Sequence, residues 1–242
     1  MTDTPSISLA PGRFFGLVPC AGKGLRAMGA QAADDTPKQY RELAGQPMVM
    51  HALAAFAGVS RLTECLVVVA PGDSFLNGHA GSRCRVADCG GDSRAASVRN
   101  GLRELQRLGA RAQDWVLVHD AARCLITAAL IDRLIDACRN DAVGGLLAQP
   151  LADTLKSAQD ARVQATLPRA DKWLAQTPQM FRLGLLLQAL EHAGEQVTDE
   201  SSALEALGHQ PLLVKGDARN FKVTFPEDFL LAEALLRGRN DS

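Results

Sequence analysis

The sequence predicts an α/β protein built on a Rossmann-like, doubly wound and mostly parallel sheet. Short apolar runs alternate with segments of helical length over most of the chain, which is typical of repeated strand–helix–strand units. A glycine-rich turn directly follows the first apolar run. The 242 residues are enough for one such domain with a full core. We therefore expect a single domain over residues 13–238, after a disordered lead at residues 1–12.

Strands and helices are expected to alternate through most of the first part of the chain. Apolar runs that predict buried parallel strands cover residues 14–18, 64–70, 84–89, 115–119 and 143–149. Helices are expected at residues 47–56, between a cap at Ser93 and a stop at Gly109, and from a cap at Thr127 through Arg139.

The last part of the chain predicts three more helices and two strands. The helices are expected at residues 183–192, at residues 199–207 and from Pro226 onward, where Glu227 and Asp228 supply the acidic first turn that a helix dipole favours. The strands are expected at residues 211–214 and 220–224.

The alternation breaks at residues 153–179. This stretch contains two candidate extended pieces, at residues 153–157 and 163–167, and no convincing amphipathic helix. Such an excursion is either a surface hairpin or an arm that packs on a partner subunit. The pattern leaves both alternatives open for residues 151–179.

The glycine-rich turn after the first strand indicates a phosphate-binding loop. Gly22 and Gly24 let backbone N–H groups approach an anion closely, and Arg26 and Lys38 add positive charge. A P-loop is excluded because Gly24 is not followed by Lys-Ser or Lys-Thr. The pattern G-x-G-x-x-A fits a dinucleotide-binding loop, but residues 28–37 are poor helix material. An NAD-dependent oxidoreductase therefore remains an alternative of another class, although Ala70-Pro71 stand where it needs an acidic ribose-binding residue.

Composition narrows the partners and the compartment. A formal net charge of −1 gives no reason to expect a nucleic-acid or membrane-surface partner. No apolar run approaches the length of a membrane span, and the amino end is polar and acidic. The six cysteines show no C-x-x-C pair and no zinc spacing. We expect a cytoplasmic protein whose cysteines are mostly buried.

Several polar residues follow the predicted strands directly. Ligands of such sheets bind beyond the carboxyl ends of the strands, so the glycine turn, Gly91-Asp92, Asp120 with Arg123, and Asp153-Thr154 are expected to form one site. His119 precedes Asp120 in an extended strand and points to the opposite face, so we expect it in the core.

The segments PCAGKGLRAMG and PKQYREL, together with GGDSRAASVRNGL, VLVHDAARCLIT, PLADTLKS, VTDESSALE and ARNFKVTFPED, resemble the 2-C-methyl-D-erythritol 4-phosphate cytidylyltransferase family. The resemblance runs from Val18 to about Leu236. It implies a nucleotidyltransferase that moves the cytidylyl group of CTP onto 2-C-methyl-D-erythritol 4-phosphate. The products are 4-diphosphocytidyl-2-C-methyl-D-erythritol and pyrophosphate, in isoprenoid precursor biosynthesis. A cytidylyltransferase for another polyol phosphate, such as ribitol 5-phosphate, is the nearest alternative, and a nucleotide-binding regulator without catalysis is a further one.

The resemblance also implies roles for individual residues. The expected catalytic cations are Arg26, Lys38 and Lys222. The expected CTP-binding residues are Cys20, Ala21, Gly22, Gly24, Gly91, Asp92 and Ser97, with Cys20 in place of the family's usual alanine. The expected substrate-binding residues are Asp120, Arg123, Thr154, Arg169, Thr177 and Thr198, and Asp120 is also expected to bind Mg²⁺. The resemblance further implies that residues 151–179 form a protruding β-arm, which is exchanged between the two subunits of a homodimer, with Arg169 reaching the site of the partner subunit.

Overall fold

The computed structural model describes residues 12–22, 36–78, 83–194 and 197–240. Its centre is a seven-stranded sheet with the strand order β11-β7-β10-β6-β1-β4-β5. The strands are β1 (Phe14–Pro19), β4 (Leu62–Val68), β5 (Cys84–Ala87), β6 (Trp115–Val118), β7 (Gly144–Pro150), β10 (Trp173–Arg182) and β11 (Leu212–Lys215). All neighbouring pairs are parallel except the two that β10 makes with β6 and β7. The predicted mostly parallel sheet is therefore confirmed.

The antiparallel strand β10 is the element that the sequence pattern does not predict. Its sequence, WLAQTPQMFR, contains Pro178 and the buried polar residues Gln176, Thr177 and Gln179. A proline amid polar side chains argues against a central strand. The ladder with β7 accommodates them because its register shifts across this stretch. The structure thus places residues 173–179, expected in the arm, in the main sheet.

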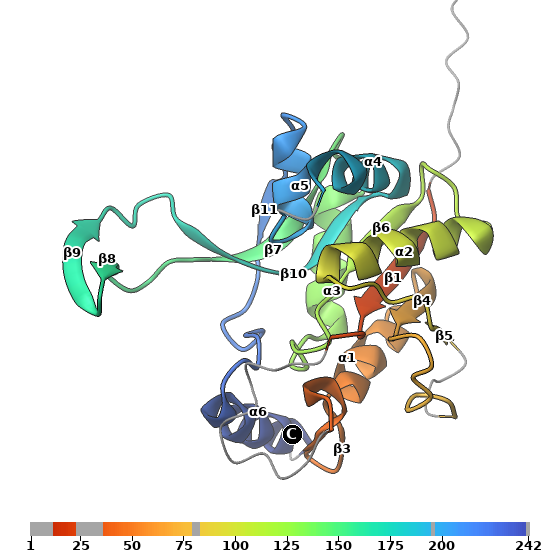
Figure 1. Ribbon diagram of the computed structural model, residues 1–242, viewed down its shortest axis with the longest axis horizontal. Coiled ribbons are helices and arrows are strands. Elements are labelled where there is room, and N and C mark those ends of the chain that lie inside the picture. The colour runs from red at the N-terminus through yellow and green to blue at the C-terminus, as the bar shows by residue number, and fades with distance from the viewer. Residues whose placement is uncertain (1–11, 23–35, 79–82, 195–196, 241–242) are drawn as a thin grey trace, which may run out of the picture.

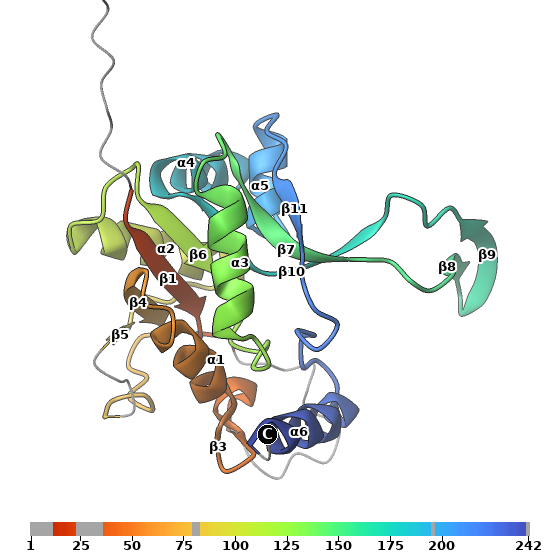
Figure 2. The ribbon, with the colours of Figure 1, turned by 180° about the vertical axis from the view of Figure 1, so that it is seen from behind.

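Helices cover both faces of the sheet (Figures 1 and 2). One face carries α1 (Met48–Ala57) and α3 (Ala128–Cys138), and the other carries α2 (Arg94–Arg107), α4 (Leu183–Ala193) and α5 (Glu200–Ala206). The predicted caps are confirmed, since Ser93 Oγ accepts from the Ala96 N–H and Thr127 Oγ1 accepts from the Leu130 N–H. Two buried apolar clusters, one on each face, pack these helices against the sheet.

The last helix, α6 (Pro226–Asn240), lies away from the sheet beside the short strands β2 (Glu42–Leu43) and β3 (Gln46–Pro47) (Figure 1). A separate apolar cluster joins Ala232 and Leu236 of α6 to Leu43 and Leu125. The strand predicted at residues 220–224 is wrong, because this segment crosses the carboxyl edge of the sheet and joins no ladder. Its backbone partner is instead a loop, since the Val223 N–H donates to Ala122 O at 2.9 Å.

A two-stranded hairpin projects far from the body of the molecule (Figures 1 and 2). It consists of β8 (Leu155–Gln159) and β9 (Arg162–Leu167), which match the two predicted extended pieces. All six side chains of β9 are exposed, including Val163 and Leu167. No helix within the described parts of the chain combines the length and the apolar character needed to cross a membrane.

Candidate active site

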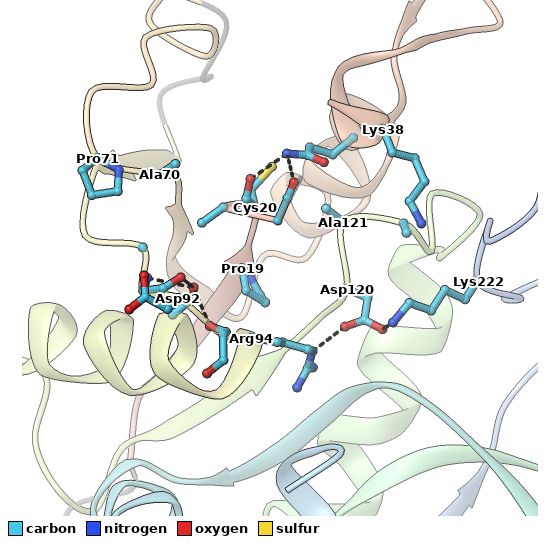
Figure 3. Close-up of a pocket in the computed structure, with 18 residues that line it drawn as sticks. Pro19, Cys20, Lys38, Ala70, Pro71, Asp92, Arg94, Asp120, Ala121 and Lys222 are labelled. Atoms are coloured by element: carbon cyan, nitrogen blue, oxygen red, sulfur yellow. Dashed lines mark hydrogen bonds and ion pairs between the residues drawn. The ribbon is translucent and has the colours of Figure 1, made fainter. Parts of the chain in front are cut away.

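A cavity of about 740 Å³ opens at the carboxyl edge of the parallel strands (Figure 3). The loops that leave β1, β4, β5 and β6 all line it, at residues 19–22, 70–71, 90–94 and 120–122. Ser97 of α2, Lys38, Gln39 and Lys222 complete the lining. The chain runs outward from β1 to β4 and β5 on one side and returns as β6 on the other, so the cavity lies where the strand order reverses.

The backbone of the turn after β1 is fixed by hydrogen bonds from two sides. The Cys20 N–H donates to Val68 O at 2.7 Å, and the buried Gln39 amide donates to Cys20 O and Gly22 O, each at 2.9 Å. Gly90 packs against this turn, where a side chain would bring its Cβ within 2.7 Å of Val69 O. Only glycine fits there. The predicted Gly24 and Arg26 lie outside the described residues.

The loop before α2 forms a second wall of the cavity. Ser97 Oγ accepts from the Gly91 N–H at 3.1 Å and donates to Ser93 O at 3.0 Å. Asp92 lies on the opposite side of the cavity from Lys222 (Figure 3). The predicted nucleotide residues Gly91, Asp92 and Ser97 therefore share this wall and face the same cavity as Cys20 and Ala21.

Asp120 is surrounded by positive charge. Arg94 Nε lies 2.9 Å from Asp120 Oδ1 and Lys222 Nζ lies 2.9 Å from Oδ2, so the two cations reach the carboxylate from opposite sides (Figure 3). Arg123 Nε lies 3.8 Å from Oδ2. Burial alone would raise the pKa of Asp120, but Arg94, Lys222 and Arg123 hold it well below the ordinary range. Asp120 is therefore an ionised carboxylate in the cavity, and three cationic side chains lie close to it.

Thr177 of β10 holds Asp120 from behind. Its Oγ1 accepts from the Asp120 N–H at 3.0 Å and donates to His119 Nδ1 at 3.0 Å. His119 Nε2 donates to Arg123 O at 3.1 Å, which leaves Nδ1 as the acceptor. Burial lowers the pKa of His119 to about 4. His119 is thus a neutral core residue, as predicted.

The remaining predicted substrate residues are not brought into this cavity by a single chain. Arg123 turns away and donates to Asn220 O at 2.7 Å and Ala175 O at 3.1 Å. Thr154 is exposed at the foot of the hairpin, and Arg169 donates to Ala152 O in the same arm. Thr198 is exposed before α5. Their roles stay predictions.

The sequence matches one family along nearly the whole chain. The family model described as "IspD: 2-C-methyl-D-erythritol 4-phosphate cytidylyltransferase" matches residues 15–238. The chain belongs to this family. The 2-C-methyl-D-erythritol 4-phosphate cytidylyltransferase of Ralstonia nicotianae is 53% identical over 96% of this chain and 96% of its own length. The bifunctional IspD/IspF enzyme of Albidiferax ferrireducens is 60% identical over 99% of this chain, which spans 57% of that enzyme.

Solved structures of IspD enzymes share the fold. A crystal structure of 4-diphosphocytidyl-2C-methyl-D-erythritol synthase superposes with a TM-score of 0.82 at 40% identity, over 93% of this chain and 99% of that one. The Francisella tularensis IspD enzyme gives a TM-score of 0.78 at 31% identity, over 92% and 99% of the two chains. The expected family, fold class and cytidylyltransferase activity are confirmed, and the alternative of an NAD-dependent oxidoreductase is set aside.

Two residues that hold Asp120 in this cavity, one directly and one through the other, were not predicted from the sequence. Arg94 lines the cavity and bridges Asp120 to Glu200, and Glu200 is fully buried at the start of α5. They stand 106 positions apart, and no local spacing signals such a pair. A carboxylate directly after the Asp199 cap of α5 is ordinarily interpreted as a helix-dipole partner, so nothing in the sequence indicates that it binds Arg94.

Proposed function

We propose that this cavity carries out the family's reaction, the joining of CTP and 2-C-methyl-D-erythritol 4-phosphate, through the cations around Asp120. The observation that carries the proposal is the meeting of Lys38, Lys222 and Arg94 in one cavity beside the glycine turn. Three cations in a cavity that also holds Asp120 suit a site that receives a triphosphate and a phosphomonoester together.

The wall formed by Gly91, Asp92 and Ser97 is the proposed cytosine subsite. Cytosine presents an exocyclic amine donor where uracil presents a carbonyl acceptor. Carbonyl and carboxylate oxygens of this loop are acceptors, and Ser97 Oγ fixes the loop through its contact with the Gly91 N–H. Such a wall favours CTP over UTP.

The proposed chemistry needs positioning more than proton transfer. A phosphomonoester oxygen of methylerythritol phosphate forms a bond to the α-phosphorus of CTP, while the bond from that phosphorus to the bridging oxygen breaks and its electron pair leaves with pyrophosphate. The attacking oxygen is already anionic near neutral pH, so no general base is required. His119 is consistent with this, since it is buried and neutral behind Asp120. Lys38 and Lys222 then neutralise charge on the phosphate oxygens.

Asp120 is the residue that would hold Mg²⁺. Magnesium is typically bound by one or two carboxylates together with phosphate oxygens and water, and the low pKa of Asp120 keeps this carboxylate ionised. When bound, the ion would neutralise charge on the triphosphate. The residues present fit this use, with Lys222 as the neighbour that has to yield space at Oδ2.

A homodimer with exchanged arms is the proposed assembly. The projecting hairpin exposes Val163 and Leu167, and the adjoining start of β10 exposes Leu174. These apolar side chains are exposed to solvent in a single chain, which supports packing on a second copy. Arg169 would then serve the partner's cavity.

The free state of all six cysteines supports a reducing compartment, the cytoplasm.

The lysine roles are tested by steady-state kinetics of Lys38→Ala and Lys222→Ala. Each variant is expected to lose about 10²- to 10³-fold in kcat, the usual cost of removing one donor that stabilises developing charge. Lys215→Ala on the exposed edge strand β11 is the matched control and should turn over like the unmodified protein. Turnover of Lys38→Ala and Lys222→Ala equal to that control would refute the proposed roles.

A further inference from the structure

A buried glutamate reaches the cavity through an arginine. Glu200, the first residue of α5, has no solvent exposure. Its two carboxylate oxygens accept from Arg94 Nη1 at 2.6 Å and Nη2 at 3.0 Å. The third donor of the same guanidinium, Nε, goes to Asp120 Oδ1 at 2.9 Å. One planar cation therefore joins the carboxylate inside the cavity to a carboxylate outside it.

These contacts belong to a closed ring that returns to one strand. Thr177 of β10 accepts from the Asp120 N–H, and Asp120 leads through Arg94 to Glu200. The next residue, Ser201, donates its N–H at 2.7 Å to the side chain of Gln179, which is also on β10. The ring thus begins and ends two residues apart on the same strand, and each of its members is buried or partly buried. A ring of this kind fixes the guanidinium in position and in plane.

The two cations on Asp120 differ in how firmly they are held. Arg94 is fixed by hydrogen bonds to two carboxylates, and its side chain is 29% exposed. Lys222 contacts Asp120 with one ammonium group on a flexible stem, and its side chain is 44% exposed. When a triphosphate enters, the mobile ammonium is the one that can move to the phosphate oxygens. Asp120 then keeps a cation at hydrogen-bond distance only if Arg94 stays where it is, since Arg123 Nε lies 3.8 Å away.

We propose that Glu200 is a positioning residue for cytidylyl transfer, which anchors Arg94 on Asp120 so that Lys222 is released to the phosphates without stranding the carboxylate or drawing Arg94 after it. The inference rests on the proposed function, because it assigns Lys222 and Asp120 to the phosphate-binding cavity. Glu200 itself touches no substrate and acts only through Arg94.

A purely structural role makes a different prediction. Buried ion pairs are a weak source of stability, since an apolar pair of similar volume often serves as well. If Glu200 only held α5 on the sheet, its loss would lower the melting temperature and the folded fraction, and each folded molecule would keep its turnover. A positioning role instead changes kcat per folded molecule.

The test is a double-mutant cycle on kcat with Glu200→Gln and Arg94→Lys. Gln keeps the size of the side chain without its charge, and Lys keeps the charge but cannot bridge two carboxylates. Each single variant should lose about tenfold or more in kcat per folded molecule, with the KM for CTP changed less than about threefold. Both substitutions remove the same contact. The kcat of the double variant should therefore be no more than about threefold below that of the less active single variant, and not reduced by the product of the two single losses.

Glu191→Gln is the matched control, because it removes the carboxylate of an exposed glutamate–arginine pair on α4 that takes no part in the ring. It should leave kcat unchanged. If Glu200→Gln fails to fold, Arg94→Lys alone decides, and unchanged kcat in that variant overturns the inference. Unchanged kcat in Glu200→Gln, or multiplicative losses in the double variant, also overturns it. An unmodified protein without turnover would instead refute the proposed function.

Discussion

Asp120 shows how far single residues of this site follow from sequence. Its position directly after a buried strand predicts a place at the ligand-binding edge, and the structure puts it there with Lys222. A lone lysine in a late segment carries no such signal by itself, so Lys222 could be predicted only through the resemblance of its flanking residues. Arg94 and Glu200 could not be predicted, because their pairing depends on how α2 and α5 are placed over the same face of the sheet.

Asp114 ties the start of β1 to the turn before β6. Its buried carboxylate accepts from the Arg13 N–H at 2.9 Å, from Arg13 Nη2 at 2.7 Å and from the Arg111 N–H at 2.8 Å. Burial alone would raise the pKa of Asp114, but the hydrogen bonds from Arg111 and Arg13 hold it below the ordinary value. A carboxyl whose pKa is lower in the folded state stabilises the fold above its unfolded pKa, and this contribution fades as pH falls through the folded pKa.

Asp114→Asn is therefore expected to lower the free energy of unfolding by about 1.5–3 kcal/mol near neutral pH. The difference from the unmodified protein should shrink on acidification below about pH 4. Urea denaturation at several pH values measures both quantities. Asp160→Asn, at the exposed tip of the hairpin, is the control and should change little. A difference that is constant with pH would show that the charge of Asp114 is not what stabilises this turn.

The cysteines offer a second prediction at this scale. Burial raises the pKa of the Cys20 thiol to about 12, although Cys20 lines the cavity. A hydrogen bond from Cys65 lowers the pKa of the half-buried Cys84 thiol. Since the thiolate is the reactive form, iodoacetamide near neutral pH should label Cys84 first and leave Cys20 among the last. Mass spectrometry of timed samples measures the order, with unfolded protein as the control. Rapid labelling of Cys20 would mean that its thiol is far more accessible than its burial indicates.

At the level of elements, the parallel strands and the helices between them could be predicted because each carries its own periodicity and caps. β10 could not, because its polar residues serve the site instead of the core. Thr177 supports Asp120, and Gln179 binds the start of α5. At residues 220–224 a strand was predicted and none is present. The alternation of apolar and polar residues there reflects packing over the sheet edge and not pairing with a strand.

The hairpin gives the prediction at this scale. Replacing Val163 and Leu167 together by Lys places charge on one exposed face of β9, and it should disrupt the proposed dimer. Light scattering should then report a single chain of 25.8 kDa, where the unmodified protein gives twice that mass. Turnover should fall with it, because Arg169 no longer reaches a partner's cavity.

Gln164→Lys adds one positive charge to the other face of β9 and serves as the control. It should leave both mass and turnover unchanged. An unmodified protein that stays monomeric at micromolar concentration would remove the proposed role of Arg169 in a partner's site.

The whole molecule places its chemistry where the sheet topology brings separate loops together. The loops after β1, β4, β5 and β6 come from distant parts of the sequence, and only the reversal of strand order at β1 makes them neighbours. The segment with Lys222 then crosses the same edge. It is held there by two backbone hydrogen bonds of Val223, whose carbonyl accepts from Lys38 Nζ and whose N–H donates to Ala122 O. Family membership adds the reaction, and the cavity shows which charges are available for it.

Pyrophosphate release by the unmodified protein tests the central claim most directly. CTP and Mg²⁺ are supplied with either 2-C-methyl-D-erythritol 4-phosphate or ribitol 5-phosphate in parallel. We predict release with the first acceptor at least about 100-fold faster than with the second, because a site built to hydrogen-bond one polyol leaves polar groups unpaired with another. Release only with ribitol 5-phosphate would contradict the assigned acceptor while keeping the cytidylyl transfer. No release with either acceptor would contradict the whole account.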